Sequence, residues 1–87
     1  MTRDHISRAA EILGSQRALA DAVGVTPGAV SQWALGIHPV PIERAVQIDR
    51  ATSGAVTRRD LRPDDWGDIW PELIDAEHPW PAKQEAA

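Results

Sequence analysis

The sequence predicts an all-α protein, a compact bundle of about five short helices that contains a helix-turn-helix and continues into a C-terminal extension. Apolar residues recur three and four positions apart through residues 4–52, as they do on one face of a helix. Glycines fall where these apolar patterns stop, at positions where a helix can end. Prolines divide the chain beyond residue 62 into short pieces, so we expect no long helix there.

The first helix is expected over residues 4–13, because an apolar stripe with helical spacing is followed there by a glycine. The stripe consists of Ile6, Ala9, Ala10 and Leu13, and Gly14 ends it. Ser15 is then a suitable N-cap for a second helix over residues 16–23.

The second helix and the turn after it carry the most informative pattern in the chain. Leu19 and Val23 lie four positions apart and share a helical face, and Ala20 is small enough to let another helix approach closely. Gly24 stands where this helix must stop and reverse, and Val25 is suited to fill the corner of the turn.

A third helix is expected from Pro27 to about Leu35. Thr26 is a good N-cap, and proline suits the first helical position, where its missing N–H is not needed. Val30 and Trp33 should face the core, although stacking of Trp33 on a base is an alternative. The positions left facing outward are Gly28, Ser31, Gln32 and Leu35.

The rest of the bundle follows from prolines and one capping motif. Two prolines keep residues 37–40 from forming a helix, and Pro41 then opens a fourth helix that ends at Ser53 and Gly54. This helix is expected to present Ala45, Ile48 and either Ala51 or Thr52 to the core. Thr57 and Asp60 resemble a capping box, which predicts a short helix at residues 58–61.

The chain is expected to divide into a domain over residues 1–62 and an acidic extension over residues 63–87. The extension has too many apolar residues for a wholly disordered tail, so we expect order to about residue 74 and mobility after it. Trp66, Ile69, Trp70 and Leu73 are expected either to form a homodimer contact or to cover the core of the monomer.

Composition and motifs exclude several classes of function. The chain has no cysteine, its three histidines are isolated, and it contains no nucleophile-base set and no phosphate-binding loop. We therefore expect no enzymatic activity, no metal, no cofactor and no small-molecule ligand. Since no apolar run is long enough to span a bilayer or to act as a signal peptide, we expect a cytoplasmic protein that does not bind membranes.

The charges are distributed unevenly along the chain, which has a formal net charge of −4. Residues 1–62 carry eight arginines and six acids, whereas residues 63–87 carry one lysine and seven acids. An arginine-bearing, nearly neutral domain can still contact nucleic-acid phosphates, with a modest electrostatic contribution.

Residues 14–36 resemble the helix-turn-helix of lambdoid phage Cro proteins and repressors. The run Ile-Glu-Arg-Ala-Val-Gln-Ile at 42–48 and Leu-Arg-Pro-Asp at 61–64 are similar to the Cro-like branch that includes YdaS-type regulators. The resemblance covers residues 4–65. It implies a prophage transcriptional regulator, a Cro-like repressor that binds a short palindromic operator in double-stranded DNA as a homodimer. The alternative is an antitoxin-like interaction module that acts mainly through a partner protein.

The resemblance implies that the helix at 27–35 reads bases in the major groove through Pro27, Gly28, Ser31 and Gln32. Gln32 is the best candidate, because glutamine can make a bidentate pair with adenine. Pro27 and Gly28 are apolar, and they favour van der Waals contact or close backbone approach.

Phosphate contacts are expected from Gln16, Arg17, Thr26, His38 and Arg44. For Arg44, an ion pair with Glu43 or Asp49 is an alternative. The basic cluster Arg58, Arg59 and Arg62 fits either contact with the DNA backbone or a solvated or tail-paired face. Asp64, Asp65 and Asp68 lack the other ligands of a calcium loop and are expected to be a solvated acidic face.

Overall fold

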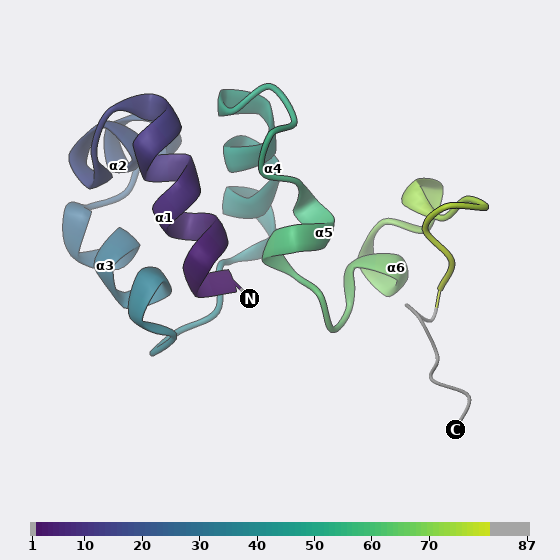
Figure 1. The fold of residues 1–87 in the computed structure, drawn as a ribbon. Helices are drawn as coiled ribbons and strands as arrows, with labels where there is room; N and C mark the ends of the chain where they lie inside the picture. The colour runs from purple at the N-terminus through teal and green to yellow at the C-terminus, as the bar shows by residue number, and fades with distance from the viewer. Residues whose placement is uncertain (1, 81–87) are drawn as a thin grey trace.

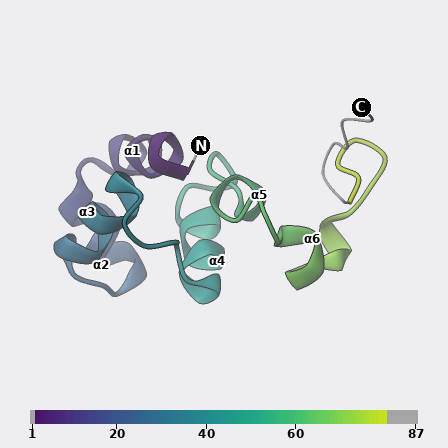
Figure 2. The same cartoon turned by 90° about the horizontal axis from the view of Figure 1, so that it is seen from below.

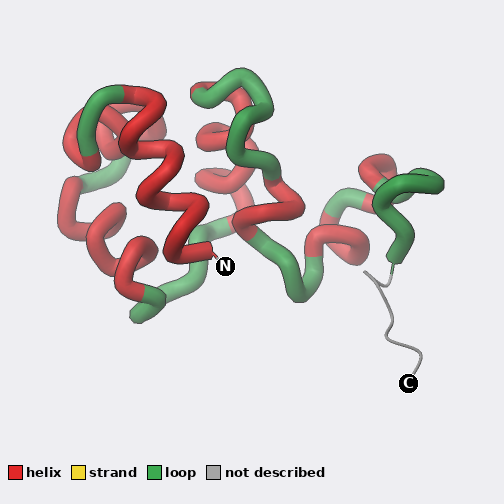
Figure 3. The backbone as a smooth tube through the Cα atoms, viewed as in Figure 1, coloured by secondary structure: helices red, strands yellow, loops and turns green. Residues whose placement is uncertain are grey.

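The computed structural model describes residues 2–80 of the 87-residue chain. Helices are the only regular secondary structure in that range (Figure 3), and the predicted all-α fold is therefore confirmed. In chain order the elements are α1 (Thr2–Leu13), α2 (Gln16–Val23), α3 (Pro27–Leu35), α4 (Ile42–Ala51), α5 (Arg58–Leu61), α6 (Trp66–Ile69) and the 3₁₀ helix η1 (Pro71–Leu73).

The helices form a bundle with an extension at one end (Figure 1). α1, α2 and α3 pack against one another, α4 packs against α2, and α5 contacts both α1 and α4. α6 and η1 continue from α5, at the end of the molecule opposite α2 and α3, and Figure 2 shows the same separation from below. The molecule is consequently elongated, with extents of 40 × 24 × 19 Å.

The core lies where α1 to α5 meet. The apolar stripe predicted for the first helix is buried, with Leu13 partly covered at its end. The largest fully buried side chains are Ile6, Leu19, Val23, Val30, Val40, Ile48, Val56 and Leu61. Burial of this apolar surface is the main force that holds the helices together.

The expected helices are observed with small differences at two ends. The spans predicted for α2, α3 and α5 are those observed, whereas α1 begins at Thr2, two residues before the predicted start. Pro41 is the N-cap of α4 and not its first residue, because its ψ of 153° is extended. Its carbonyl nevertheless accepts the first helical hydrogen bond, from the N–H of Ala45 at 2.9 Å.

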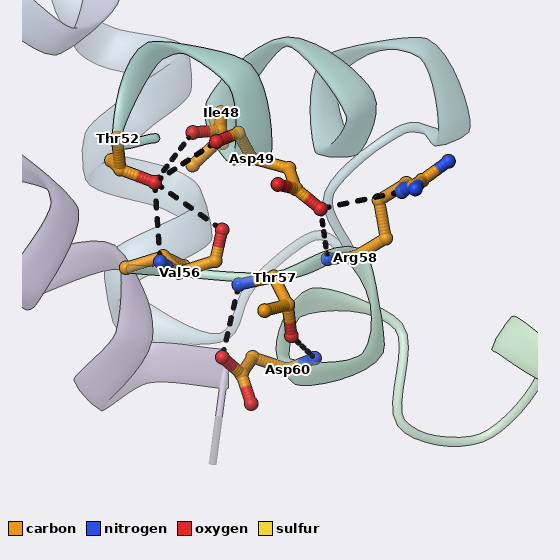
Figure 4. Close-up of polar contacts among 7 residues, drawn as sticks. All are labelled: Ile48, Asp49, Thr52, Val56, Thr57, Arg58 and Asp60. Atoms are coloured by element: carbon orange, nitrogen blue, oxygen red, sulfur yellow. Dashed lines mark hydrogen bonds and ion pairs between the residues drawn. The ribbon is translucent and has the colours of Figure 1, made fainter. Parts of the chain in front are cut away.

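A buried threonine holds the connection between α4 and α5 (Figure 4). The Thr52 hydroxyl donates to the Ile48 carbonyl at 2.9 Å and accepts from the N–H of Val56 at 3.1 Å. The predicted capping box is present, since Thr57 accepts from the N–H of Asp60 and Asp60 accepts from the N–H of Thr57. These bonds satisfy polar groups that burial would otherwise leave without partners.

The described structure continues beyond residue 74, the limit of order expected from the sequence. The Asp75 carboxylate accepts from the N–H groups of Glu77 and His78 at 3.0 and 2.8 Å and closes a turn. Trp80 then lies edge-on against Trp66, with ring centroids 5.0 Å apart. The structure thus describes a closed turn and a ring contact after residue 74, and residues 81–87 of the expected mobile end lie outside the described residues.

Candidate nucleic-acid interface

Local capping bonds set the ends of α2 and the start of α3. The Ser15 hydroxyl accepts from the N–H of Ala18 at 3.0 Å and starts α2. Gly24 ends that helix with a φ of 74°, a left-handed conformation that glycine adopts without steric penalty. The Thr26 hydroxyl accepts from the N–H of Ala29 at 3.2 Å and starts α3, with Pro27 in its first turn. All of these caps agree with the sequence-based expectation.

Burial determines which side of α3 remains available for binding. Val30 is fully buried and Trp33 is 4% exposed, so both face α1 and α2 and not the solvent. The expectation that Trp33 belongs to the core is confirmed, and its alternative as a base-stacking residue is excluded. Gly28 and Gln32 are exposed on the outer side of α3.

The remaining base-reading candidates lie on the same helix. Pro27 is exposed at its start, and Ser31 is half-buried one turn later. The four candidates that the resemblance implies for base reading therefore lie together in the first part of α3. Beyond them Leu35, at the end of α3, is 60% exposed.

The phosphate candidates are distributed over four segments: α2, the turn before α3, the loop after α3, and α4. Gln16 and Arg17 are exposed in the first turn of α2, and His38 is exposed in the loop after α3. Thr26 is exposed as well, although its hydroxyl already accepts the capping bond. Gln16 and Arg17 thus lie at the start of α2, whereas Thr26 directly precedes α3.

Arg44 is half-buried, and its guanidinium bonds within α4. Its Nη1 donates to Oε1 of Gln47 at 2.8 Å. Neither of the two expected roles, phosphate contact or an ion pair with Glu43 or Asp49, is seen among the described residues: Arg44 bonds to Gln47, and Asp49 pairs with Arg58. The three-residue spacing of Arg44 and Gln47 was a signal available in the sequence.

The two arginines of α5 contact tryptophans of the C-terminal segment, residues 62–80, and do not extend freely into solvent. Arg58 pairs with Asp49 at 3.3 Å and lies over the Trp70 ring, 5.4 Å from its centroid. Arg59 lies over the Trp66 ring at 5.7 Å. The cluster is therefore paired with the tail, the second of its two expected roles.

Arg62 joins the C-terminal segment to the loop after α3. Its Nη1 donates to the Val40 carbonyl at 2.8 Å, and its Nε and Nη2 donate to the two carboxylate oxygens of Asp65 at 3.1 and 2.7 Å. This hydrogen bonding keeps the pKa of the Asp65 carboxyl below its usual value and raises the pKa of Arg62. Asp65 is consequently a structural partner and not part of a solvated acidic face.

The tryptophans proposed for a dimer contact belong to the monomer itself. Trp66 is 4% exposed and Trp70 is 8% exposed, while Ile69 and Leu73 are half-buried against the same core. Within the single chain, arginines and Trp80 cover the two tryptophans. The alternative, that they cover the small monomer's core, is the arrangement observed.

Two further observations limit the chemistry of the described part of the chain. Among the side chains that the structure describes, those of residues 5–80, no three of histidine, cysteine, aspartate or glutamate converge in a way that could hold a metal ion. In the same range no helix combines the length and apolarity needed to cross a membrane.

Comparisons with known proteins extend this description. The model of a family described as "Bacterial toxin YdaS" matches residues 6–69. The "Putative transcriptional regulator YdaS" of Escherichia coli strain K12 is 45% identical over 60 residues, which are 68% of this chain and 61% of that protein. The chain therefore spans only part of that relative's length.

A solved structure supports the fold. The "Cro protein from putative prophage element Xfaso 1 in Xylella fastidiosa strain Ann-1" has a TM-score of 0.64 and 45% sequence identity to this chain. The match covers 74% of this chain and 94% of the other. The arrangement of helices is thus Cro-like.

Proposed function

We propose that this chain, which belongs to the family described as bacterial toxin YdaS, is a sequence-specific DNA-binding transcriptional regulator. The observation that carries this proposal is the outer face of α3, where Gln32 is exposed while Val30 and Trp33 fix the opposite face in the core. Relatives named as a transcriptional regulator and as a Cro protein support it. α3 would lie in the major groove, with Gln16 and Arg17 contacting phosphate.

We propose further that the regulator is a repressor that binds a short palindromic operator as a homodimer. One recognition helix contacts only a few base pairs, so a single copy selects its site poorly. Two copies related by a two-fold axis would place their α3 helices about 34 Å apart, in successive major grooves on one face of the DNA. Such a dimer would block access to a promoter that overlaps the operator.

The proposal is tested by selecting binding sites from random DNA and from the DNA that flanks the gene. We expect a palindromic site, and we expect Gln32→Ala to weaken binding to it by about 1–3 kcal/mol while leaving binding to random DNA unchanged. Ser7→Ala is the control, because Ser7 is an exposed polar residue on α1, outside the helix-turn-helix. Failure to select any site, or equal losses on both DNAs, would contradict the assignment of α3.

The assembly is tested separately by sedimentation with and without the selected site. Two protein copies per palindrome support the homodimer. A single copy bound at every protein concentration would exclude it, without affecting the assignment of α3.

A second candidate is an interaction module that acts through a partner protein. The family description as a toxin favours it, as does the acidic C-terminal segment, in which Asp64, Glu72 and Glu77 are exposed. Binding to the product of a neighbouring gene, without selection of a DNA site, would support this candidate over the first.

A further inference from the structure

The chain has two glycines inside α-helices, and they differ in what surrounds the missing side chain. At Gly67 in α6, a Cβ atom would overlap the indole ring of Trp80. At Gly28 in α3, the nearest atom to an added Cβ is the Thr26 hydroxyl oxygen at 3.7 Å, an ordinary van der Waals distance. Packing within the chain therefore requires glycine at position 67 but not at position 28.

Gly28 also has no conformational reason to be glycine. It lies in the helical part of the chain and is not among the described residues with a positive φ. Glycine in a helix is less stable than alanine, because it loses more backbone freedom on folding. The missing side chain thus lowers the stability of α3, and no contact within the described chain explains it.

The surroundings of Gly28 indicate what kind of neighbour would use this space. Pro27 and Gly28 are exposed in the first turn of α3 and carry no polar side-chain group. In the proposed complex this end of the helix enters the major groove first. The thymine methyl is the apolar group that base pairs present in that groove, and small apolar groups of a protein contact it.

We propose that Gly28 is a specificity-determining residue, whose missing side chain leaves room for a thymine methyl group against the start of α3. This inference rests on the proposed DNA-binding function and adds one base contact to it. Pro27 supplies the apolar wall beside the methyl group, and Gln32 remains one turn away for a polar contact with another base.

The test compares Gly28→Ala with the wild-type protein on the site that wild type selects. We expect Gly28→Ala to bind this site about tenfold more weakly, because the added methyl group occupies the space of the thymine methyl. The melting temperature of the variant should be equal to or higher than that of wild type. The matched control is Ala22→Gly at an exposed position of α2, which should lower the melting temperature and leave DNA affinity unchanged.

A second arm replaces each thymine of the site in turn with uracil, which removes only the methyl group. At one position the difference between Gly28→Ala and wild type should shrink to within about twofold, as expected for two groups that compete for one space. Equal binding by both proteins, or a difference that no uracil relieves, would overturn the inference while the proposed function stands. A wild type that selects no site would overturn both.

Discussion

The helix-turn-helix and the C-terminal segment, residues 15–36 and 62–80, are held together in different ways. In the helix-turn-helix, each helix end is fixed by a bond to a residue within a few positions, as at Ser15 and Thr26. In the C-terminal segment, the short α6 has no side-chain cap. The tryptophans at its two ends, Trp66 and Trp70, are covered by arginines of α5. The helix-turn-helix therefore depends on local caps and a buried core, whereas α6 also needs contacts with arginine side chains of α5.

The largest expected effect is on the core of the helix-turn-helix. Trp33→Ala should lower the free energy of unfolding by about 3–5 kcal/mol, because it leaves a large cavity beneath α3. That loss is a large part of the total stability of a small domain, which is about 5–15 kcal/mol. Urea denaturation followed by circular dichroism measures it without relying on tryptophan fluorescence.

The control for this prediction is Ile37→Ala, in the loop that follows α3. Ile37 is 59% exposed, so its truncation should change the free energy of unfolding by no more than about 0.5 kcal/mol. Similar losses in the two variants would mean that Trp33 is not the core residue that its burial indicates.

A smaller effect is expected where the C-terminal segment is tied to the bundle. Arg62→Gln removes the paired hydrogen bonds to Asp65 and the bond to the Val40 carbonyl. The free energy of unfolding should fall by about 1–3 kcal/mol, as it does when a charged hydrogen-bond partner is lost. Arg8→Gln, which removes an exposed arginine from α1, should have a much smaller effect.

Acid provides an independent check on the Arg62–Asp65 pair. The pKa of Asp65 is lowered in the folded protein, so the pair stabilises the fold above the unfolded pKa of aspartate and loses this contribution as the pH falls through the folded value. The stability difference between wild type and Arg62→Gln should therefore shrink below about pH 4. A difference that stays constant from neutral to strongly acidic pH would show that Asp65 is not the relevant partner.

The sequence predicted the bundle well because its signals are local. Ser15, Gly24 and Thr26 act on backbone groups within a few positions, so their roles follow from spacing alone. The contacts of the C-terminal segment were harder to predict, because Arg59 and Trp66 are seven positions apart and meet only after the chain turns between α5 and α6. Sequence spacing gives no signal for that contact.

In the candidate interface, too, the features set by local spacing could be predicted and the longer-range contacts could not. The outer face of α3 followed from helical periodicity, since the burial of Val30 and Trp33 fixes where Gln32 points. The partner of Arg58 did not follow, because an arginine can equally face solvent, phosphate or a carboxylate, and its pairing with Asp49, nine positions away, needed the fold to be known. Arg62 and Asp65 are three positions apart, so that pair was within reach of sequence spacing.

The smallest expected effect concerns the negative charge of the C-terminal segment. Glu72→Gln combined with Glu77→Gln removes two exposed acids and should strengthen binding to random DNA, because less negative charge then repels the phosphates. The segment lies at the end of a 40 Å molecule opposite α2 and α3 (Figure 1). Salt screens charges beyond about 8 Å at physiological ionic strength, but only beyond about 30 Å at 0.01 M.

The gain from this double substitution should therefore be small at physiological salt and should grow at low salt. Asp21→Asn is the matched control, because Asp21 is an exposed acid on α2, the helix that begins with the proposed phosphate contacts Gln16 and Arg17. If α2 lies along the DNA as proposed, neutralisation of Asp21 should strengthen binding at both salt concentrations, since its charge then acts on phosphates over a shorter distance than the tail does. Titrations of labelled random DNA at the two salt concentrations measure both effects. An equal gain from the tail variant at both concentrations would mean that the C-terminal segment lies against the DNA, and the two regions would then share one binding surface.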